Sequence, residues 1–155
     1  PHLIMANTDH TPLNLKLESA LATYIDSITT SASLTGLQVL PSHTDTESLA
    51  SPRCVITCDA MTAVNADLPG IMDCNVDIEY ITQEGQSTLA EHRRDAGRLM
   101  SWLLDITTVQ TALSATDALH CYWYQWIGQR FEKDPAGSTL TTRIAVLIRA
   151  QGRAI

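Results

Sequence analysis

Positive charge is scarce in this sequence. Its 155 residues include 10 Lys and Arg against 17 Asp and Glu, which gives a net charge of -7. Proteins that hold nucleic acid without regard to base sequence do so by neutralising phosphates with Lys and Arg. The composition therefore argues against that class of protein. It remains compatible with a protein that lets DNA slide past an acidic, repulsive wall.

Long hydrophobic runs are also absent, although the hydrophobic content of 45% is ordinary for a globular protein. No apolar run approaches the ~20 residues of a membrane-spanning helix, and no basic segment followed by an apolar one indicates a secretory signal. We therefore expect a single domain, residues 1–155, without a membrane span.

Catalytic motifs are missing as well. The sequence contains no Gly-x-Ser-x-Gly, no phosphate-binding glycine loop and no His-Glu-x-x-His. His120 precedes Cys121, but adjacent residues of a strand point to opposite faces, which argues against a paired Cys–His nucleophile. We expect no catalytic residue and no cofactor.

Cysteine is limited to Cys54, Cys58, Cys74 and Cys121, three of which lie in apolar, strand-like segments. Strand geometry would separate Cys54 and Cys58 by about 13 Å, and no second pair follows at zinc-finger spacing. We interpret the cysteines as small buried hydrophobic residues of a reduced protein.

Two acidic patterns imitate metal sites. Asp73-x-Asn75-x-Asp77 with Glu84 resembles a calcium loop, but Ile78 stands where that loop needs glycine. Asp59 with Asp77 and Glu79 resembles a metal-dependent nuclease core, in which a lysine would occupy the position of Ile81. A small metal-dependent nuclease is therefore the enzymatic alternative, and the sequence favours no bound metal.

What the sequence does have is a clear order of periodic segments. Apolar residues at helical spacing predict two helices, and alternation predicts four strands with one or two more near 37–40. The predicted helices are 12–29 and 87–105, and the predicted strands are 54–58, 72–82, 119–130 and 139–149. We predict an α+β fold with a mostly antiparallel sheet of about four to five strands and two main helices packed on one face.

Several local features refine this prediction. Thr11 and Ser87 are expected N-caps, and 109–113 is expected to add a helical turn or two. On the second helix, spacing predicts the ion pairs Glu91–Arg94 and Asp95–Arg98. His92, which lies beside Arg93 on this helix, is expected to be exposed. The connections 41–52 and 60–71 are expected to be long loops.

The strand 72–82 has two unlike faces. Val76, Ile78 and Tyr80 point to one face, which we assign to the core, whereas Asp77 and Glu79 point to the other with Asn75. The following aromatic segment, residues 121–126, lacks the interleaved Lys or Arg of a base-stacking surface. Core packing or a subunit interface is the preferred interpretation of these aromatics.

Taken together, the segments resemble the tail terminator (tail-completion) and neck proteins of long-tailed bacteriophages. The resemblance rests on the N-terminal helix, the strands 53–58 and 74–82, the helix 89–104 and the final hairpin. It implies a structural virion protein, made in the host cytoplasm, that forms a hexameric ring at the head–tail junction. Such a ring would bind its own copies, the tail tube protein and the head connector, while DNA passes the lumen. Another neck or tail-tube protein is the nearest alternative.

The resemblance supplies no catalytic residue, but it suggests a place for the acidic strand face. Because the face opposite the core must look outward, we expect Asp77 and Glu79 at the lumen or at a subunit interface. At an interface, the basic partners would be Arg94 and Arg98 of a neighbouring copy.

Overall fold

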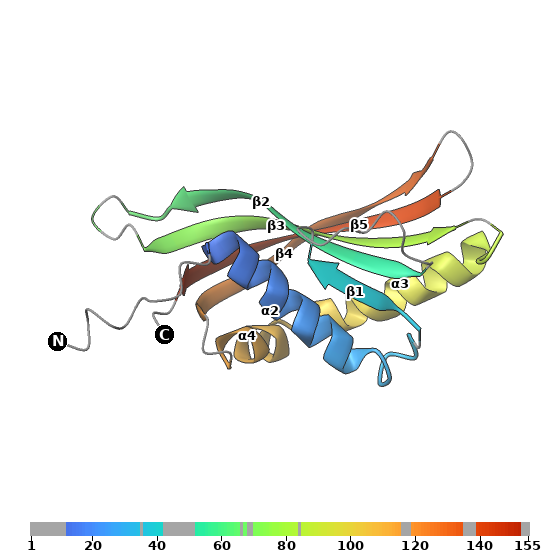
Figure 1. The fold of residues 1–155 in the computed structure, drawn as a ribbon, viewed down its shortest axis with the longest axis horizontal. Coiled ribbons are helices and arrows are strands. Elements are labelled where there is room, and N and C mark those ends of the chain that lie inside the picture. Colours follow the sequence, from blue (N-terminus) through green and yellow to red (C-terminus); the bar gives the residue numbers. More distant parts are fainter. Residues whose placement is uncertain are drawn as a thin grey trace.

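Five strands form one sheet, and the helices pack against one of its faces (Figure 1). The computed structural model describes residues 12–34, 36–41, 52–65, 67, 70–83, 85–115, 119–134 and 139–152. The strands are β1 (Gln38–Pro41), β2 (Arg53–Ala63), β3 (Ile71–Gln83), β4 (Leu119–Lys133) and β5 (Thr139–Gly152). Their spatial order is β1-β2-β3-β5-β4, with β1 parallel to β2 and every other pair antiparallel. The predicted α+β class is confirmed.

Within the described chain there are three helices: α2 (Leu13–Ile28), α3 (Leu89–Leu103) and α4 (Ile106–Ser114). The predicted helix 87–105 ends at Leu103, and the extra turns expected at 109–113 are a separate helix. Asp105 divides the two, since its side chain accepts a hydrogen bond from the backbone N–H of Thr108 and caps α4.

The N-terminus of α3 is one residue later than predicted. Thr88, not Ser87, is the N-cap, and its hydroxyl accepts from the N–H of Glu91 at 3.1 Å. The Glu91 carboxylate accepts in return from the N–H of Thr88, which completes a capping box. Glu91 is thereby occupied, and Arg94 pairs with Asp95 instead of with Glu91. The predicted Asp95–Arg98 pair is confirmed, at 3.3 Å.

The core lies between the helices and one face of the sheet. The predicted core residues Val76, Ile78 and Tyr80 are at most 1% exposed. Burial of a side chain of this kind stabilises the fold by about 1.5–3 kcal/mol. The helices contribute the matching apolar faces, with Leu17, Leu21, Ile25, Leu99, Leu103, Val109 and Leu113 fully buried.

Strand lengths exceed the predictions at both hairpins. The predicted loop 60–71 is wrong, because 60–63 continues β2 and pairs with β3 as far as Met72. Similarly, β4 extends to Lys133 and β5 to Gly152. The expected cap Thr11 and most of the expected loop 41–52 lie outside the described residues. Among the described helices, none has the length and apolarity needed to cross a membrane.

His92 is the main local surprise, because it is fully buried and not exposed. Its Nδ1 lies 2.7 Å from the Thr82 hydroxyl and its Nε2 lies 2.9 Å from the Thr142 hydroxyl. The ring also contacts Tyr80 and Phe131. His92 thus fastens α3 to strands β3, β4 and β5, and burial lowers its pKa, with a further contribution from Arg93.

A buried carboxylate fastens α2 in a similar way. Glu18 is 2% exposed, and its Oε2 accepts a hydrogen bond from the N–H of Cys58 at 2.9 Å. Cys58 begins a bulge in β2, where the register with β3 shifts between Cys58 and Ala60. Glu18 therefore satisfies a backbone donor that the bulged strand turns away from β3.

Candidate functional site

The sheet face opposite the helices carries a ladder of charged side chains. Asp73 and Glu79 of β3 stand opposite Arg149 and Arg143 of β5. Arg149 binds Asp73 through two hydrogen bonds of 2.9 and 3.1 Å, and Arg143 reaches Glu79 at 3.4 Å. The predicted acidic face is therefore neutralised at two positions by arginines of the neighbouring strand. Partly exposed pairs of this kind contribute about 0–1 kcal/mol each.

Asp77 lies between these two pairs, and its own neighbour on β5 is Ala145. The bulge of β2 brings Asp59 to the same place, so that the two carboxyl groups hydrogen-bond. Burial, the hydrogen bond with Asp59 and the Asp59 charge together raise the pKa of Asp77 to about 6. Like charges this close cannot both ionise without cost, so Asp77 keeps its proton in mildly acidic solution.

The same face is hollowed beside Asp77. A depression of about 350 Å³ lies over the junction of β3, β5 and β4. Its small central residues Gly128 and Ala145 stand opposite each other in the sheet. Asp77, Ile127, Arg130 and Arg143 also line it. Charged side chains of both signs and the apolar Ile127 therefore line the same depression.

Arg94 and Arg98 lie on the other side of the sheet. Both belong to α3, which buries His92, Ala96, Leu99 and Leu103 against the core face, and both pair with Asp95. They consequently do not meet Asp77 or Glu79 within one chain. Any contact between the two predicted groups would require a second copy.

The aromatic segment of β4 divides between core and surface. Tyr124 is buried and donates its hydroxyl to the carbonyl of Leu103 at 2.7 Å, whereas Tyr122 and Trp123 are 42% and 39% exposed. The Arg149 guanidinium lies 5.7 Å from the centre of the Trp123 ring. Trp123 therefore joins the charged ladder through a cation–π contact.

The nuclease pattern does not assemble into a metal site. Asp59 and Asp77 meet, but Glu79 is engaged by Arg143. Across the described residues, no group of three or more His, Cys, Asp and Glu side chains could hold a metal ion. Ile81 lies on the same face, at the position where the nuclease pattern needs lysine.

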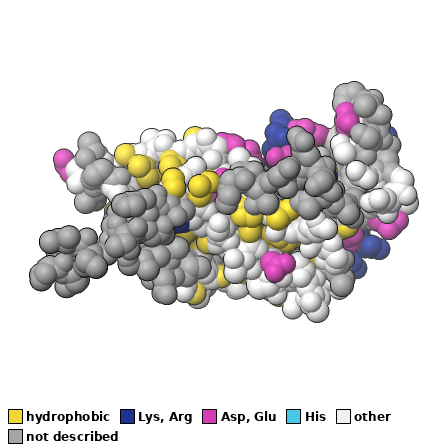
Figure 2. All heavy atoms as spheres, in the orientation of Figure 1, with side chains coloured by type: hydrophobic (Ala, Val, Ile, Leu, Met, Phe, Trp, Pro, Cys, Tyr) yellow, Lys and Arg dark blue, Asp and Glu magenta, His cyan; other side chains and the backbone are white. Residues whose placement is uncertain are grey.

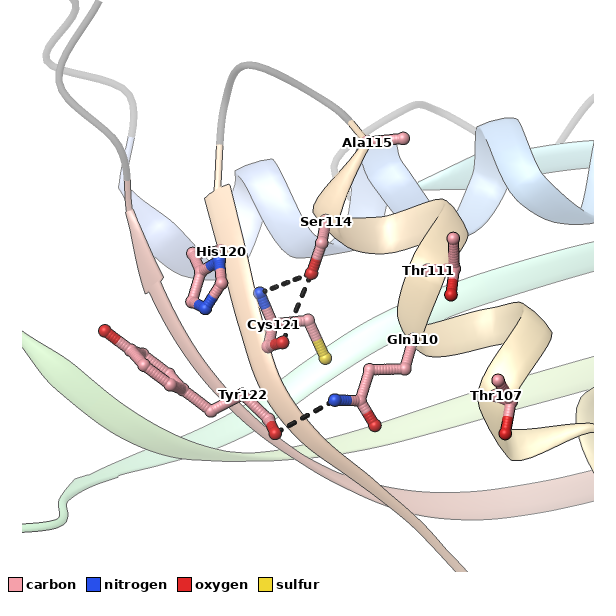
Figure 3. Close-up of a pocket in the computed structure, with 8 residues that line it drawn as sticks. All are labelled: Thr107, Gln110, Thr111, Ser114, Ala115, His120, Cys121 and Tyr122. Atoms are coloured by element: carbon pink, nitrogen blue, oxygen red, sulfur yellow. Dashed lines mark hydrogen bonds between the residues drawn. The ribbon is translucent and has the colours of Figure 1, made fainter.

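An open cleft of about 640 Å³ lies between α4 and the first residues of β4 (Figure 3). The Ser114 hydroxyl bonds both the N–H and the C=O of Cys121, and the Gln110 amide donates to the carbonyl of Tyr122 at 3.0 Å. The Cys121 thiol beside it has a pKa raised by burial, so it is not an activated nucleophile. At this cleft, side chains of α4 hydrogen-bond the backbone of the edge strand β4.

All four cysteines are buried and free, as the sequence predicts. Burial raises the pKa of Cys54 to about 12. Cys58 and Cys74 are hydrogen-bonded neighbours, which lowers the pKa of Cys58 and raises that of Cys74. None of these thiols is both exposed and acidic, which a reactive cysteine requires.

No protein-family model matches the sequence, and no curated protein matches it either. A solved structure does match: one chain of "Virion of native gene transfer agent (GTA) particle" superposes with a TM-score of 0.59. The two chains are 12% identical, and the match covers 88% of this chain and 95% of that one. At this identity the likeness shows that the two chains share their fold over almost their full lengths.

Proposed function

We propose that this protein is a structural component of a phage-like virion, a ring-forming tail terminator at the head–tail junction. The observation that carries the proposal is the full-length fold likeness to a chain of a gene transfer agent virion. Because the match covers 95% of that chain, what the two share is a whole subunit and not an isolated motif. In the proposed role the protein closes the tail tube and joins it to the head connector.

The described surface is consistent with a role in binding other proteins. The paired charges, the shallow depression and the exposed Trp123 are features that another protein could contact. The carboxylates of the described residues do not form a group that could hold a metal ion. We propose that the face with Asp77 and Glu79 looks toward the lumen or a neighbouring subunit. Arg94 and Arg98, on α3, would then face a different neighbour or solvent.

The nearest alternative is another ring component of the tail or neck. The two are separated by where the protein binds, since a terminator caps one end of the tube and a tube protein polymerises along it. The nuclease alternative predicts metal-dependent DNA cleavage that Asp77→Asn abolishes. Such cleavage would overturn the structural role.

The experiment is a combined mass and binding measurement. Light scattering on the purified protein, alone and with polymerised tail-tube protein from the same genome, should detect a hexamer of the 17.0 kDa chain. It should also detect saturable binding at the tube ends. A protein that remains monomeric and binds neither tubes nor connectors would contradict the proposal.

A further inference from the structure

Strand β4 lies at the edge of the sheet. At its start, side chains hydrogen-bond its outward backbone groups, whereas further along the strand these groups have no such partner among the described residues. Ser114 and Gln110 occupy the outward backbone groups of Cys121 and Tyr122 (Figure 3). In an antiparallel pair, every second residue points its N–H and C=O away from its partner strand. Cys121 is such an outward residue. With the two register shifts of β4 against β5 taken into account, the next outward residues are Tyr124, Trp126, Gln129 and Phe131.

The outward backbone N–H and C=O groups of these four residues have no hydrogen-bond partner among the described residues. An edge of this length is a template for another strand unless it is blocked. In Figure 1 the far part of β4 extends, with β5, away from α2 and α4.

A second open edge lies at the opposite side of the sheet. β1 pairs with β2 only from Arg53 to Ile56. The N–H of Cys58 points outward to Glu18, so the register with β3 makes Met61 and Ala63 the next outward residues. In the described residues these two also have no outward partner.

The two edges match in direction and in side-chain position. Successive antiparallel pairings make β2 and β4 run in opposite directions. A neighbouring copy that continues the sheet would therefore place its β2 antiparallel to β4. Outward residues would then face each other. The register that places Ala60 opposite Arg130 makes Met61 and Gln129, both on the helix side of the sheet, direct neighbours, and it is the register tested below.

Charged and apolar side chains lie beside both edges. Next to the β4 edge, Arg130 stands directly opposite Arg143, and both arginines pair with Glu132, whereas Asp59 and Asp77 form an acidic pair near the β2 edge. Five of the eight exposed large hydrophobic residues of the described chain lie on these strands or just past them: Met61, Val64, Tyr122, Trp123 and Ile127.

We infer that the open edge of β4 is a strand-addition site for the β2 edge of a second copy of this chain. The contact joins two different edges, so it is heterologous and generates a ring when its rotation closes. The inference rests on the proposed ring function and specifies how its subunits join. In this contact, Asp59 and Asp77 of one copy lie near Arg130 and Arg143 of the neighbouring copy.

The first test changes one outward N–H group. Gln129→Pro removes the donor while leaving the bonds to β5 intact, because proline is tolerated where an edge N–H faces outward. Gln129→Ala, the matched control, removes the side chain and keeps the donor. Loss of one hydrogen bond of about 1.4 kcal/mol corresponds to roughly tenfold weaker association per contact. Sedimentation should show this loss for Gln129→Pro alone, with the unfolding midpoints of both variants close to wild type.

The second test identifies the partner strand. A Met61→Cys, Gln129→Cys double variant treated with a bismaleimide under assembly conditions should give a ladder of covalent oligomers that ends at the ring. Each single variant, and the parent with its four buried cysteines, should stay monomeric on a denaturing gel. Dimers from Gln129→Cys alone would mean that β4 pairs with β4, and linkage to tube protein would mean a foreign strand. Either result overturns the inference.

The outcomes also separate this inference from the ring itself. If wild type and Gln129→Pro assemble equally and no ladder forms, the strand-addition contact is wrong and the ring function stands. If wild type assembles neither alone nor on tail tubes, the proposed function fails and the inference fails with it.

Discussion

At the scale of single residues, the fold opposes the ionisation of Asp77. Its pKa is raised from 3.8 to about 6, first by burial and then by Asp59. The folded state therefore holds this proton more firmly than the unfolded state. The resulting stability is present below pH 3.8 and is lost as pH rises through 6.

Replacement of this carboxyl should consequently stabilise the protein at neutral pH. We expect Asp77→Asn to raise the free energy of unfolding by about 1 kcal/mol at pH 7.5 and to have almost no effect at pH 3.5. Urea unfolding at the two pH values measures this. Asp73→Asn is the matched control on the same strand face, and it should stabilise at neither pH, because it removes the bonds to Arg149. A loss of stability for Asp77→Asn at pH 7.5 would refute the carboxyl pair.

His92 has the opposite pH dependence. Burial and Arg93 lower its pKa below 6.5, so the unfolded state binds the proton more readily. Its contribution is complete above pH 6.5 and decreases as pH falls toward the folded-state pKa. We expect His92→Gln to destabilise by about 1–3 kcal/mol at pH 7.5, because two buried hydroxyls lose well-placed partners.

The pH series is the sharper part of this prediction. Because glutamine does not titrate, the stability difference between His92→Gln and wild type should shrink from pH 7.5 to pH 5.5. A difference that stays constant with pH would contradict a neutral, buried His92.

These residues also show where single-residue prediction stops. Helical spacing correctly gave the Asp95–Arg98 pair, since both partners belong to one helix. His92 was expected to be exposed because it adjoins Arg93, but its partners Thr82 and Thr142 lie on strands that only the tertiary fold brings to α3. The alternation of β5 already put Arg143 and Arg149 on one face, but their acidic partners depend on which strand is adjacent.

At the scale of elements, two tyrosines hold the C-terminal end of α3. Tyr124 of β4 donates to the carbonyl of Leu103 at 2.7 Å, and Tyr24 of α2 donates to the carbonyl of Trp102 at 3.2 Å. The last carbonyls of a helix lack intrahelical partners. These hydroxyls supply them and tie three elements together.

We therefore expect Tyr124→Phe to lower the free energy of unfolding by about 1–2 kcal/mol. Tyr122→Phe is the matched control, because its hydroxyl bonds Gln151 at an exposed position and its loss should cost much less. Thermal or urea unfolding of the two variants measures the difference. Equal effects would mean that the end of α3 does not depend on Tyr124.

The elements themselves were largely predictable, because hydrophobic periodicity is a local property. Alternation identified β3 and β5 closely, and the helical stripe identified α2. Bulges were not predictable: the extra residues near Asp59, Tyr122 and Ile127 change the faces of β2 and β4 without any sequence signal that we detected. The exposed apolar positions of β4 follow from two of these bulges.

At the scale of the whole molecule, the fold class was predictable and the strand order was not. Segment order correctly indicated one sheet with helices on one side (Figure 1). The pairing of β3 with β5, which are separated by two helices and β4, builds the charged ladder. Figure 2 shows hydrophobic side chains near the β2–β3 hairpin and in the middle of this face, and most of the charged ones in the half that carries the β4–β5 hairpin. That distribution is a property of the assembled sheet.

We propose that this fold builds a ring that closes a tail tube. Negative-stain imaging of the purified protein, alone and mixed with polymerised tail-tube protein from the same genome, tests it most directly. We expect six-fold rings with a central opening, in solution or as caps confined to one end of each tube. Tubes with bare ends beside monomers of the 17.0 kDa chain would contradict it.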